Sequence, residues 1–586
     1  MWNYIVASCT VLVLSSVYHY NVNKPKSIVE YPRERYDYIV VGAGTAGCVL
    51  ASELSEVPNI TVLLVEAGGY FNWLSTVPLA APMMQGSSVD WRYKTESQYY
   101  SSRGLINYRQ SWPRGKGLGG SGQLNYLVHS FGIPEDYDNW PTGWSHADLH
   151  PYFERVSRKM HLPGTRPEGR LIHAFESLNA SFFGENVTFD RATNTINRGG
   201  RWSSYHAYLQ NSWNRKNLHI LSNSLVTKVR NCHIDCNFLE ICFLLRLLKQ
   251  ILVDDDSIAY GIEVKYRDGT PGRIEARGEI IVCAGAVNTP QLMMVSGIGP
   301  AEELEKHQLP TISDLPQVGK NLFDHLNLPI YVNLDAPVSI TLKKMQTVAE
   351  VIKYFVFETG LLATNGIMGM GRVNDSLIVL FGVASADEKL LKDIANFETD
   401  TFRSLFPSHN DTSHEGFIYL ASCIQPKSRG NVTLRSKNIL DPPFIEPAYL
   451  ENAADVSCTQ QAINLALETL ETDQFRTLGA NVHVPDLEEC QHLRQDYRDP
   501  EYAECVIRTA SLTGHHPGGT CRMGQNSNDS VVDHYLRVHG LKNLRIVDAS
   551  VLPTPISGTP NSVIIAMATR AADFILKRSR KPTLFV

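Results

Sequence analysis

Near the start of the chain, the apolar and polar positions follow the order strand, turn, helix, strand. Residues 36–41 (YDYIVV) form a short apolar run typical of a buried strand, and residues 46–55 have a helical pattern with no charge before Glu53. Between them stands GAGTAG, a G-x-G-x-x-G turn, and the next apolar run (ITVLLV) ends at Glu66. An acidic residue about 20 positions after such a turn is typical of dinucleotide-binding units. We therefore predict a dinucleotide site at this turn.

The residues of this turn have separate physical roles. Gly42 permits the tight turn, Gly44 lets a pyrophosphate approach the backbone, and Gly47 allows the helix to pack on the sheet. The free N–H groups at the start of the helix attract phosphate, and Glu66 can accept hydrogen bonds from ribose hydroxyls. The motif is compatible with FAD and with NAD, and a purely structural glycine turn is the alternative. The candidate residues are Gly42, Gly44, Thr45, Ala46, Gly47 and Glu66.

A second glycine-rich segment covers residues 114–128 (RGKGLGGSGQLNYLV). A loop with so few side chains can press its backbone against a flat or anionic ligand, although a merely flexible loop is the alternative. Its candidate ligand contacts are Gly119, Gly120 and Asn125.

Two later segments suggest how the domains are arranged. Residues 279–299 have the pattern of a buried strand, a small-residue turn and a helix, and they suit the same sheet as the first unit. Near the C-terminus, TGHHPGGTCRMG precedes a strand that leads to Asp548 and then a long apolar helix. We therefore expect both ends of the chain to share one domain. Residues 322–504 have mixed strands and helices without a nucleotide motif, and we expect them to face the substrate.

Composition narrows the class of protein. Of 586 residues, 43% are hydrophobic and 19% are charged, which predicts a large core and excludes general disorder. The net charge of −6 argues against nucleic acid as the main partner. The 11 cysteines form no C-x-x-C pair, so we expect neither a disulfide scaffold nor a zinc site, and Cys48 and Cys283 stand in apolar runs typical of inert buried thiols. Sequons compatible with secretion occur at Asn179, Asn186 and Asn410.

The first 20 residues are signal-like. Residues 5–18 are apolar or weakly polar without a charge, and this run is shorter than the roughly 20 residues that span a bilayer. A secretory signal is the favoured interpretation, which places the protein in the secretory pathway, outside the cell or with the endoplasmic reticulum. An uncleaved anchor, which alone would imply membrane association, and a buried segment are the alternatives.

Residues 230–251 (RNCHIDCNFLEICFLLRLLKQI) interrupt what would otherwise be a plain hairpin. They bring three cysteines and an apolar run that an exposed hairpin tip cannot easily bury. An extra amphipathic helix, a partner-binding element and a gene-model error are the possible explanations, and we favour the error.

Taken together, these motifs resemble the glucose-methanol-choline (GMC) family of flavin-dependent alcohol oxidoreductases, which has many secreted members in insects. The resemblance runs from residue 36 to residue 574 without the interruption. The segment GAGTAGCVLASELSE is similar to the family's FAD-binding start, GKGLGGSGQLN to its first signature, and GAVNTPQLMMVSGIG to its second. The segments HPGGTCRMG and SGTPNS are similar to the family's catalytic C-terminal part.

The resemblance implies an α/β fold (α+β overall). A Rossmann-type FAD-binding domain would consist of residues 36–321 and 505–586, and residues 322–504 would form a substrate-binding domain on an antiparallel sheet. By position, His516 would be the active-site base and Asn561 its partner. Asp548 would lie near the flavin, and Val226 would contact the adenine. Members with covalently held flavin have His where this chain has Leu124, so we expect noncovalent FAD.

Four positions depart from the family pattern and are expected to border the flavin: Gly122, Gln123, His129 and Phe131. His515, which precedes the motif, is expected behind the site or on the surface.

The resemblance implies oxidation of a neutral alcohol, with an electron acceptor that the motifs leave open. Such a reaction removes an O–H proton and a C–H hydride, so we assign His516 as general base, flavin as hydride acceptor and Asn561 as the donor that holds the alkoxide. A catalytically silent flavin-binding protein is the alternative. An NAD-dependent reductase is disfavoured because nicotinamide enzymes do not need the C-terminal His/Asn segment.

Overall fold

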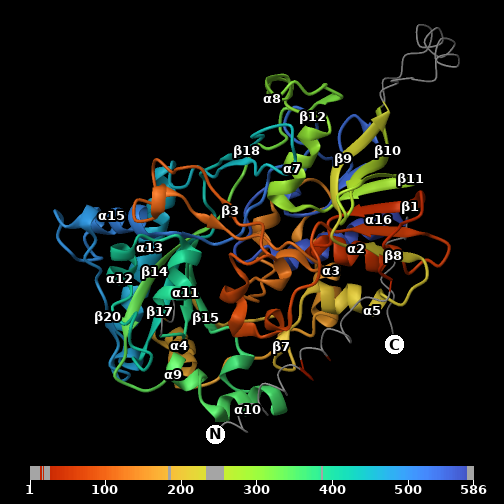
Figure 1. Ribbon diagram of the computed structural model, residues 1–586. Helices are drawn as coiled ribbons and strands as arrows, with labels where there is room; N and C mark the ends of the chain where they lie inside the picture. Colours follow the sequence, from red (N-terminus) through yellow and green to blue (C-terminus); the bar gives the residue numbers. More distant parts are fainter. Residues whose placement is uncertain are drawn as a thin grey trace, which may run out of the picture.

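The computed structural model describes residues 14–15, 18, 27–182, 186–232, 257–384 and 387–576 (Figure 1). The expectations for the signal-like segment and for the interruption at 230–251 therefore lie almost entirely outside the described residues. Within the described part of the chain, no helix is both long and apolar enough to cross a membrane.

The first sheet has a parallel core in the order β8-β2-β1-β11-β23. Its central strands are buried on both faces, which explains why their sequences are continuous apolar runs rather than alternating ones. An antiparallel ribbon of β9 and β10 extends the sheet from β11, and β22 pairs with β10. The strands are β1 (Arg35–Val41), β2 (Val62–Val65), β8 (Leu218–Leu221), β9 (Leu225–Cys232), β10 (Ser257–Lys265), β11 (Pro271–Val282), β22 (Leu541–Lys542) and β23 (Leu544–Ile546).

Helices from early and late in the chain meet in this unit. Helix α2 (Thr45–Leu54) packs against α16 (Asn561–Ile575), which also contacts α3 (His146–Lys159). Figure 1 shows the red N-terminal strands beside the blue C-terminal helix. The Rossmann-type expectation for the fold is therefore confirmed.

The second sheet is antiparallel throughout, in the order β20-β14-β17-β16-β15-β5, with β21 also paired to β14. Helix α13 (Ala453–Leu470) packs on β16 and β17 and covers one face. The antiparallel substrate sheet implied by the family resemblance is confirmed. The strands are β5 (Val187–Arg191), β14 (Leu326–Asn333), β15 (Ile367–Val373), β16 (Ser376–Phe381), β17 (Gly416–Cys423), β20 (Asn481–Val482) and β21 (Leu512–Thr513).

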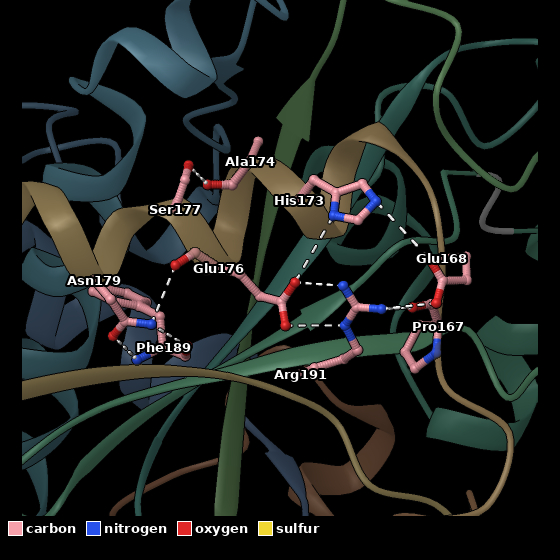
Figure 2. A network of polar contacts seen from close by, with 9 residues as sticks. All are labelled: Pro167, Glu168, His173, Ala174, Glu176, Ser177, Asn179, Phe189 and Arg191. Carbon is pink, nitrogen blue, oxygen red and sulfur yellow. Dashed lines mark hydrogen bonds and ion pairs between the residues drawn. The ribbon is translucent and has the colours of Figure 1, made fainter.

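This second sheet takes strands from outside residues 322–504. Strand β5 and the preceding helix α4 (Arg170–Ser181) come from the expected FAD-binding range, and β21 comes from the C-terminal range. Figure 2 shows how α4 is held to β5, with Arg191 paired to Glu176 and Glu168. The Asn179 side chain donates to the Phe189 carbonyl at 2.6 Å and accepts from its N–H at 2.9 Å.

Two disulfides that the sequence pattern did not indicate lie in the part of the molecule built around the antiparallel sheet, called the substrate unit below. Cys423–Cys458 joins the end of β17 to α13, and Cys490–Cys505 joins a short 3-10 turn to α15 (Pro500–Ala510). Cys48 and Cys283 are buried free thiols, and burial raises the pKa of each, as expected for inert core cysteines.

Candidate active site

A cavity of about 490 Å³ lies between the two sheets. Its walls come from the ends of β1 and β2, the second glycine-rich segment, the C-terminal segment with the two histidines, and one face of the antiparallel sheet. Gly47 and Gly119 lie behind the lining. The other predicted site residues line it: Gly42, Gly44, Thr45, Ala46, Glu66, Gly120, Asn125, Val226, His516, Asp548 and Asn561.

The glycine turn has the geometry that its three roles require. Gly42 has φ +99°, and a Cβ there would lie 2.5 Å from the Cys283 carbonyl oxygen. A Cβ on Gly47 would lie 1.9 Å from the carbonyl oxygen of Gly42, so only glycine lets α2 approach the turn this closely. At Gly44 the nearest atom would be 4.0 Å away, which leaves the backbone open to a ligand.

The start of α2 suits an anion. Gly44 is the N-cap, no side chain among the described residues caps the helix, and its first turn has no acidic residue. The N–H groups and the positive end of the helix dipole therefore remain available to a pyrophosphate. Glu66 accepts from the N–H groups of Ala43 and Gly68, each at 2.9 Å. Burial raises the Glu66 pKa to about 7, while these hydrogen bonds oppose the rise.

The second glycine loop packs directly on the first. The N–H of Gly119 donates to the Ala43 carbonyl at 2.7 Å, and Gly120, with φ +53°, would place a Cβ only 2.7 Å from the Gly44 Cα. Two glycine-rich segments far apart in sequence therefore build one backbone wall, as a flat, anionic dinucleotide requires. FAD fits this wall.

Arg201 holds the loop in place and was not expected from the sequence. Its Nη1 donates to the Asn125 Oδ1 at 2.6 Å and to the Gly122 carbonyl at 3.1 Å. Its Nε donates to the Ser75 carbonyl at 2.6 Å. Burial lowers the Arg201 pKa to about 9. Asn125 is thus both a lining residue and the point at which the loop is anchored.

Asp548 joins the second signature to the C-terminal segment. Its Oδ2 accepts from the Gly285 N–H at 2.9 Å and the Thr289 hydroxyl at 2.6 Å, and its Oδ1 accepts from the Ser550 N–H at 2.8 Å. Burial raises the Asp548 pKa, while these hydrogen bonds lower it. Val226, buried on β9, also lines the cavity.

His516 is paired with a second histidine that the sequence motifs did not identify. The Nδ1 atoms of His516 and His325 are 2.9 Å apart, and His325 Nε2 lies 2.9 Å from the Ile424 carbonyl oxygen. A carbonyl can only accept, so neutral His325 carries its proton on Nε2 and accepts at Nδ1. His516 must then donate from Nδ1, which leaves the lone pair on its Nε2.

A buried carboxylate positions the His516 backbone. Asp324 Oδ1 accepts from the His516 N–H at 2.6 Å, and its Oδ2 accepts from the Thr513 hydroxyl at 2.5 Å and from the Tyr449 hydroxyl. The adjacent pair Asp324–His325 at the start of the expected substrate range was the available sequence signal for this support. The pKa of His516 is lowered well below its ordinary value, chiefly by burial and also by the nearby Arg114 guanidinium.

Asn561 is oriented from the glycine turn. Its Oδ1 accepts from the Thr45 hydroxyl at 2.8 Å, so the amide nitrogen is left as the donor at the cavity. Asn561 is the first residue of α16, and Thr45 is the first residue of α2. The packing of these two helices therefore brings the expected catalytic asparagine to the nucleotide-binding turn.

The expectation for His515 needs correction. His515 lines the cavity rather than standing behind it, with φ +61°, and burial lowers its pKa to about 3. Gly122, Gln123, His129 and Phe131 are not among the residues that line the cavity, and their expected place beside the flavin stays a prediction. Gln123, for example, turns away to donate to the Ser203 hydroxyl at 2.9 Å.

Comparisons with known proteins agree with this geometry. Profiles described as GMC oxidoreductase match residues 36–327 and 426–568. The chain is 36% identical over 565 residues to neither inactivation nor afterpotential protein G of Drosophila melanogaster, covering 92% of this chain and 90% of the relative. It is 31% identical over 586 residues to glucose dehydrogenase (FAD, quinone) of Drosophila pseudoobscura pseudoobscura, covering 94% and 88%.

Solved structures show the same fold. Pyridoxine 4-oxidase from Mesorbium loti superposes with a TM-score of 0.72 at 25% identity, covering 93% of this chain and 100% of that one. Formate oxidase from Aspergillus oryzae RIB40 gives a TM-score of 0.73 at 22% identity, covering 94% and 99%, which is a likeness of fold alone. The sequence motifs, the two sheets and these relatives agree, and the chain belongs to the GMC oxidoreductase family of FAD-dependent enzymes.

Proposed function

We propose that the protein oxidises an alcohol with His516 as general base. Two hydrogen bonds support this proposal, one between His516 and His325 and one between His325 and the Ile424 carbonyl. Together they leave the lone pair on His516 Nε2. That atom takes the hydroxyl proton of the substrate, and the Asn561 amide donates to the oxygen on which negative charge develops. When bound, FAD supplies the acceptor for the hydride that leaves the alcohol carbon.

The hydrogen bond between the two histidines also allows His516 to become protonated. As Nε2 of His516 becomes protonated, Nδ1–H keeps its hydrogen bond to His325, so the imidazolium forms without a change of partner. The lowered His516 pKa keeps the base neutral, and therefore active, at neutral pH.

We propose that FAD is held noncovalently by the two glycine loops, Glu66 and Asp548. Leu124 lines the cavity and presents only hydrocarbon where members with covalently held flavin have His. Denaturing the protein in acid should release all of the flavin into the supernatant. Flavin that remains with the precipitated protein would contradict noncovalent binding.

The first test is anaerobic bleaching of the flavin absorbance by a panel of alcohols. Bleaching supports alcohol oxidation, and admitting air then distinguishes an oxidase from a dehydrogenase. The variant His516→Ala should lose roughly 10²–10⁴-fold in turnover while keeping FAD. His219→Ala is the matched control, since His219 on β8 lies outside the cavity lining and bonds to Tyr36. A yellow protein that no alcohol bleaches would indicate a catalytically silent flavin-binding protein instead.

We also propose that the protein enters the secretory pathway. Two disulfides among the described residues support this location, because such bonds persist in oxidising compartments. Membrane association would then require that the N-terminal segment stays attached. Mass spectrometry of the native protein, with thiols alkylated before and after reduction, should find Cys423, Cys458, Cys490 and Cys505 protected. Free thiols at these positions would argue for a reducing compartment.

A further inference from the structure

One wall of the cavity is the face of the antiparallel sheet opposite helix α13. Along β16 the residues alternate, so that Ser376, Ile378 and Leu380 are buried on the α13 side. The intervening residues of β16 line the cavity instead: Leu377, Val379 and Phe381. A strand with one covered face normally turns polar residues to the other. Here the second face is apolar as well, which indicates that a nonpolar ligand covers it.

The neighbouring strands continue this wall in register. Leu377 lies opposite Ser422, Val379 opposite Leu420, and Phe381 opposite Ile418 on β17. On the far side of β17, Asn327 faces Ser422 and Pro329 faces Leu420. The row that contains Asn327 and Ser422 is nearest to His325, which directly precedes β14. Polarity therefore decreases with distance from His325, the partner of His516.

Helices close the apolar end. Leu391 and Ile394 of α11 (Glu388–Ala395) and Phe402 of α12 (Thr399–Leu405) line the same cavity. Among the described residues of this sheet and these two helices, none that lines the cavity carries a charge. The Ser422 hydroxyl already donates to the Leu326 carbonyl at 2.7 Å.

This wall discriminates between classes of alcohol. A sugar would bury several hydroxyls against Leu377, Val379 and Phe381, whose side chains cannot accept or donate, at a cost of roughly 1–3 kcal/mol for each unpaired group. A quaternary ammonium substrate would meet no carboxylate on this side. The acidic residues of the lining, Glu66 and Asp548, belong to the nucleotide half and are held by backbone N–H groups.

We infer that the substrate is an alcohol with one hydroxyl at the His516 end and an otherwise apolar hydrocarbon body. The inference rests on the proposed function and deepens it. The hydroxyl lies by the polar row, and the hydrocarbon covers the face formed by Leu377, Val379 and Phe381.

The test uses the FAD-loaded protein with straight-chain primary alcohols from ethanol to decanol, with D-glucose and with choline. The second-order rate constant for anaerobic flavin bleaching should rise about fourfold for each added methylene until the wall is covered. Glucose and choline should react more slowly than butanol. A faster reaction with either of them would overturn the inference while leaving alcohol oxidation in place.

A variant localises the effect. Val379→Thr keeps the shape but adds a hydroxyl to the apolar wall, and should lower the decanol rate constant about tenfold with little change for ethanol. Val373→Thr is the matched control, because Val373 on β15 lies outside the cavity lining. Equal losses in both variants would overturn the assignment of the wall.

A binding measurement separates the two proposals. Trp91 lines the cavity, so decanol and glucose binding can be followed by tryptophan fluorescence without turnover. If no alcohol bleaches the flavin, alcohol oxidation fails. Decanol binding that Val379→Thr weakens still supports an apolar ligand in that case. Tighter binding of glucose than of decanol would overturn the inference of an apolar ligand.

Discussion

Replacing His325 disturbs the proposed base, His516, without changing the His516 side chain itself. His325→Phe keeps a buried ring but removes the acceptor that lies 2.9 Å from His516 Nδ1. A buried donor left without a partner costs about 1–3 kcal/mol, and the proton can then reside on Nε2, where it blocks catalysis. At about 1.4 kcal/mol for each factor of ten, we expect kcat to fall about 5- to 150-fold.

The pH profile gives a readout that a general loss of structure would not reproduce. Burial is the largest cause of the lowered His516 pKa, so the wild-type base loses activity only when the pH falls through that lowered value. Neutral His325 accepts from the His516 Nδ1–H and so stabilises the imidazolium, and its removal makes His516 harder to protonate. The acid limb of the kcat/KM profile should therefore shift to lower pH in His325→Phe.

Two further variants complete this experiment. His325→Gln offers a carbonyl oxygen to Nδ1 and should recover part of the lost kcat. His219→Phe makes the same change at a histidine of β8 outside the cavity lining, whose pKa burial also lowers, and should leave the profile unmoved. The reasoning is refuted if His325→Phe retains normal FAD, normal kcat and an unshifted acid limb.

Three other expectations can be tested separately. Asn561→Ala should lower kcat about 10²–10³-fold with FAD retained, measured by anaerobic flavin bleaching, and an unchanged kcat would exclude its role as donor. Replacing Cys490 and Cys505 together by Ser should cost about 3 kcal/mol, seen as a lower denaturant midpoint for the substrate unit, because the disulfide closes a loop with a sequence separation of 15. Peptide mapping of secreted protein should find no glycan at Asn179, whose amide donates to the Phe189 carbonyl, whereas exposed Asn410 is open to modification.

Local chemistry made the nucleotide unit predictable. Gly42, Gly44 and Gly47 act on their own turn and on the strand and helix beside it, so their spacing alone predicts the βαβ arrangement that the structure has. The continuous apolar strands likewise indicate burial on both faces without reference to distant residues. The family resemblance rests on such local segments, and it led correctly to the two-sheet fold.

The sequence by itself determined the glycine turns, the buried parallel strands and the family. Only the tertiary structure decided that His325 supports His516, that Arg201 anchors Asn125, and that β5 joins the substrate sheet. A period-two pattern says which residues share a face, but it does not say which strand lies alongside or whether protein or ligand covers that face. The support of the base and the apolar wall both depend on which distant segments become neighbours, so they emerge only when the chain is folded.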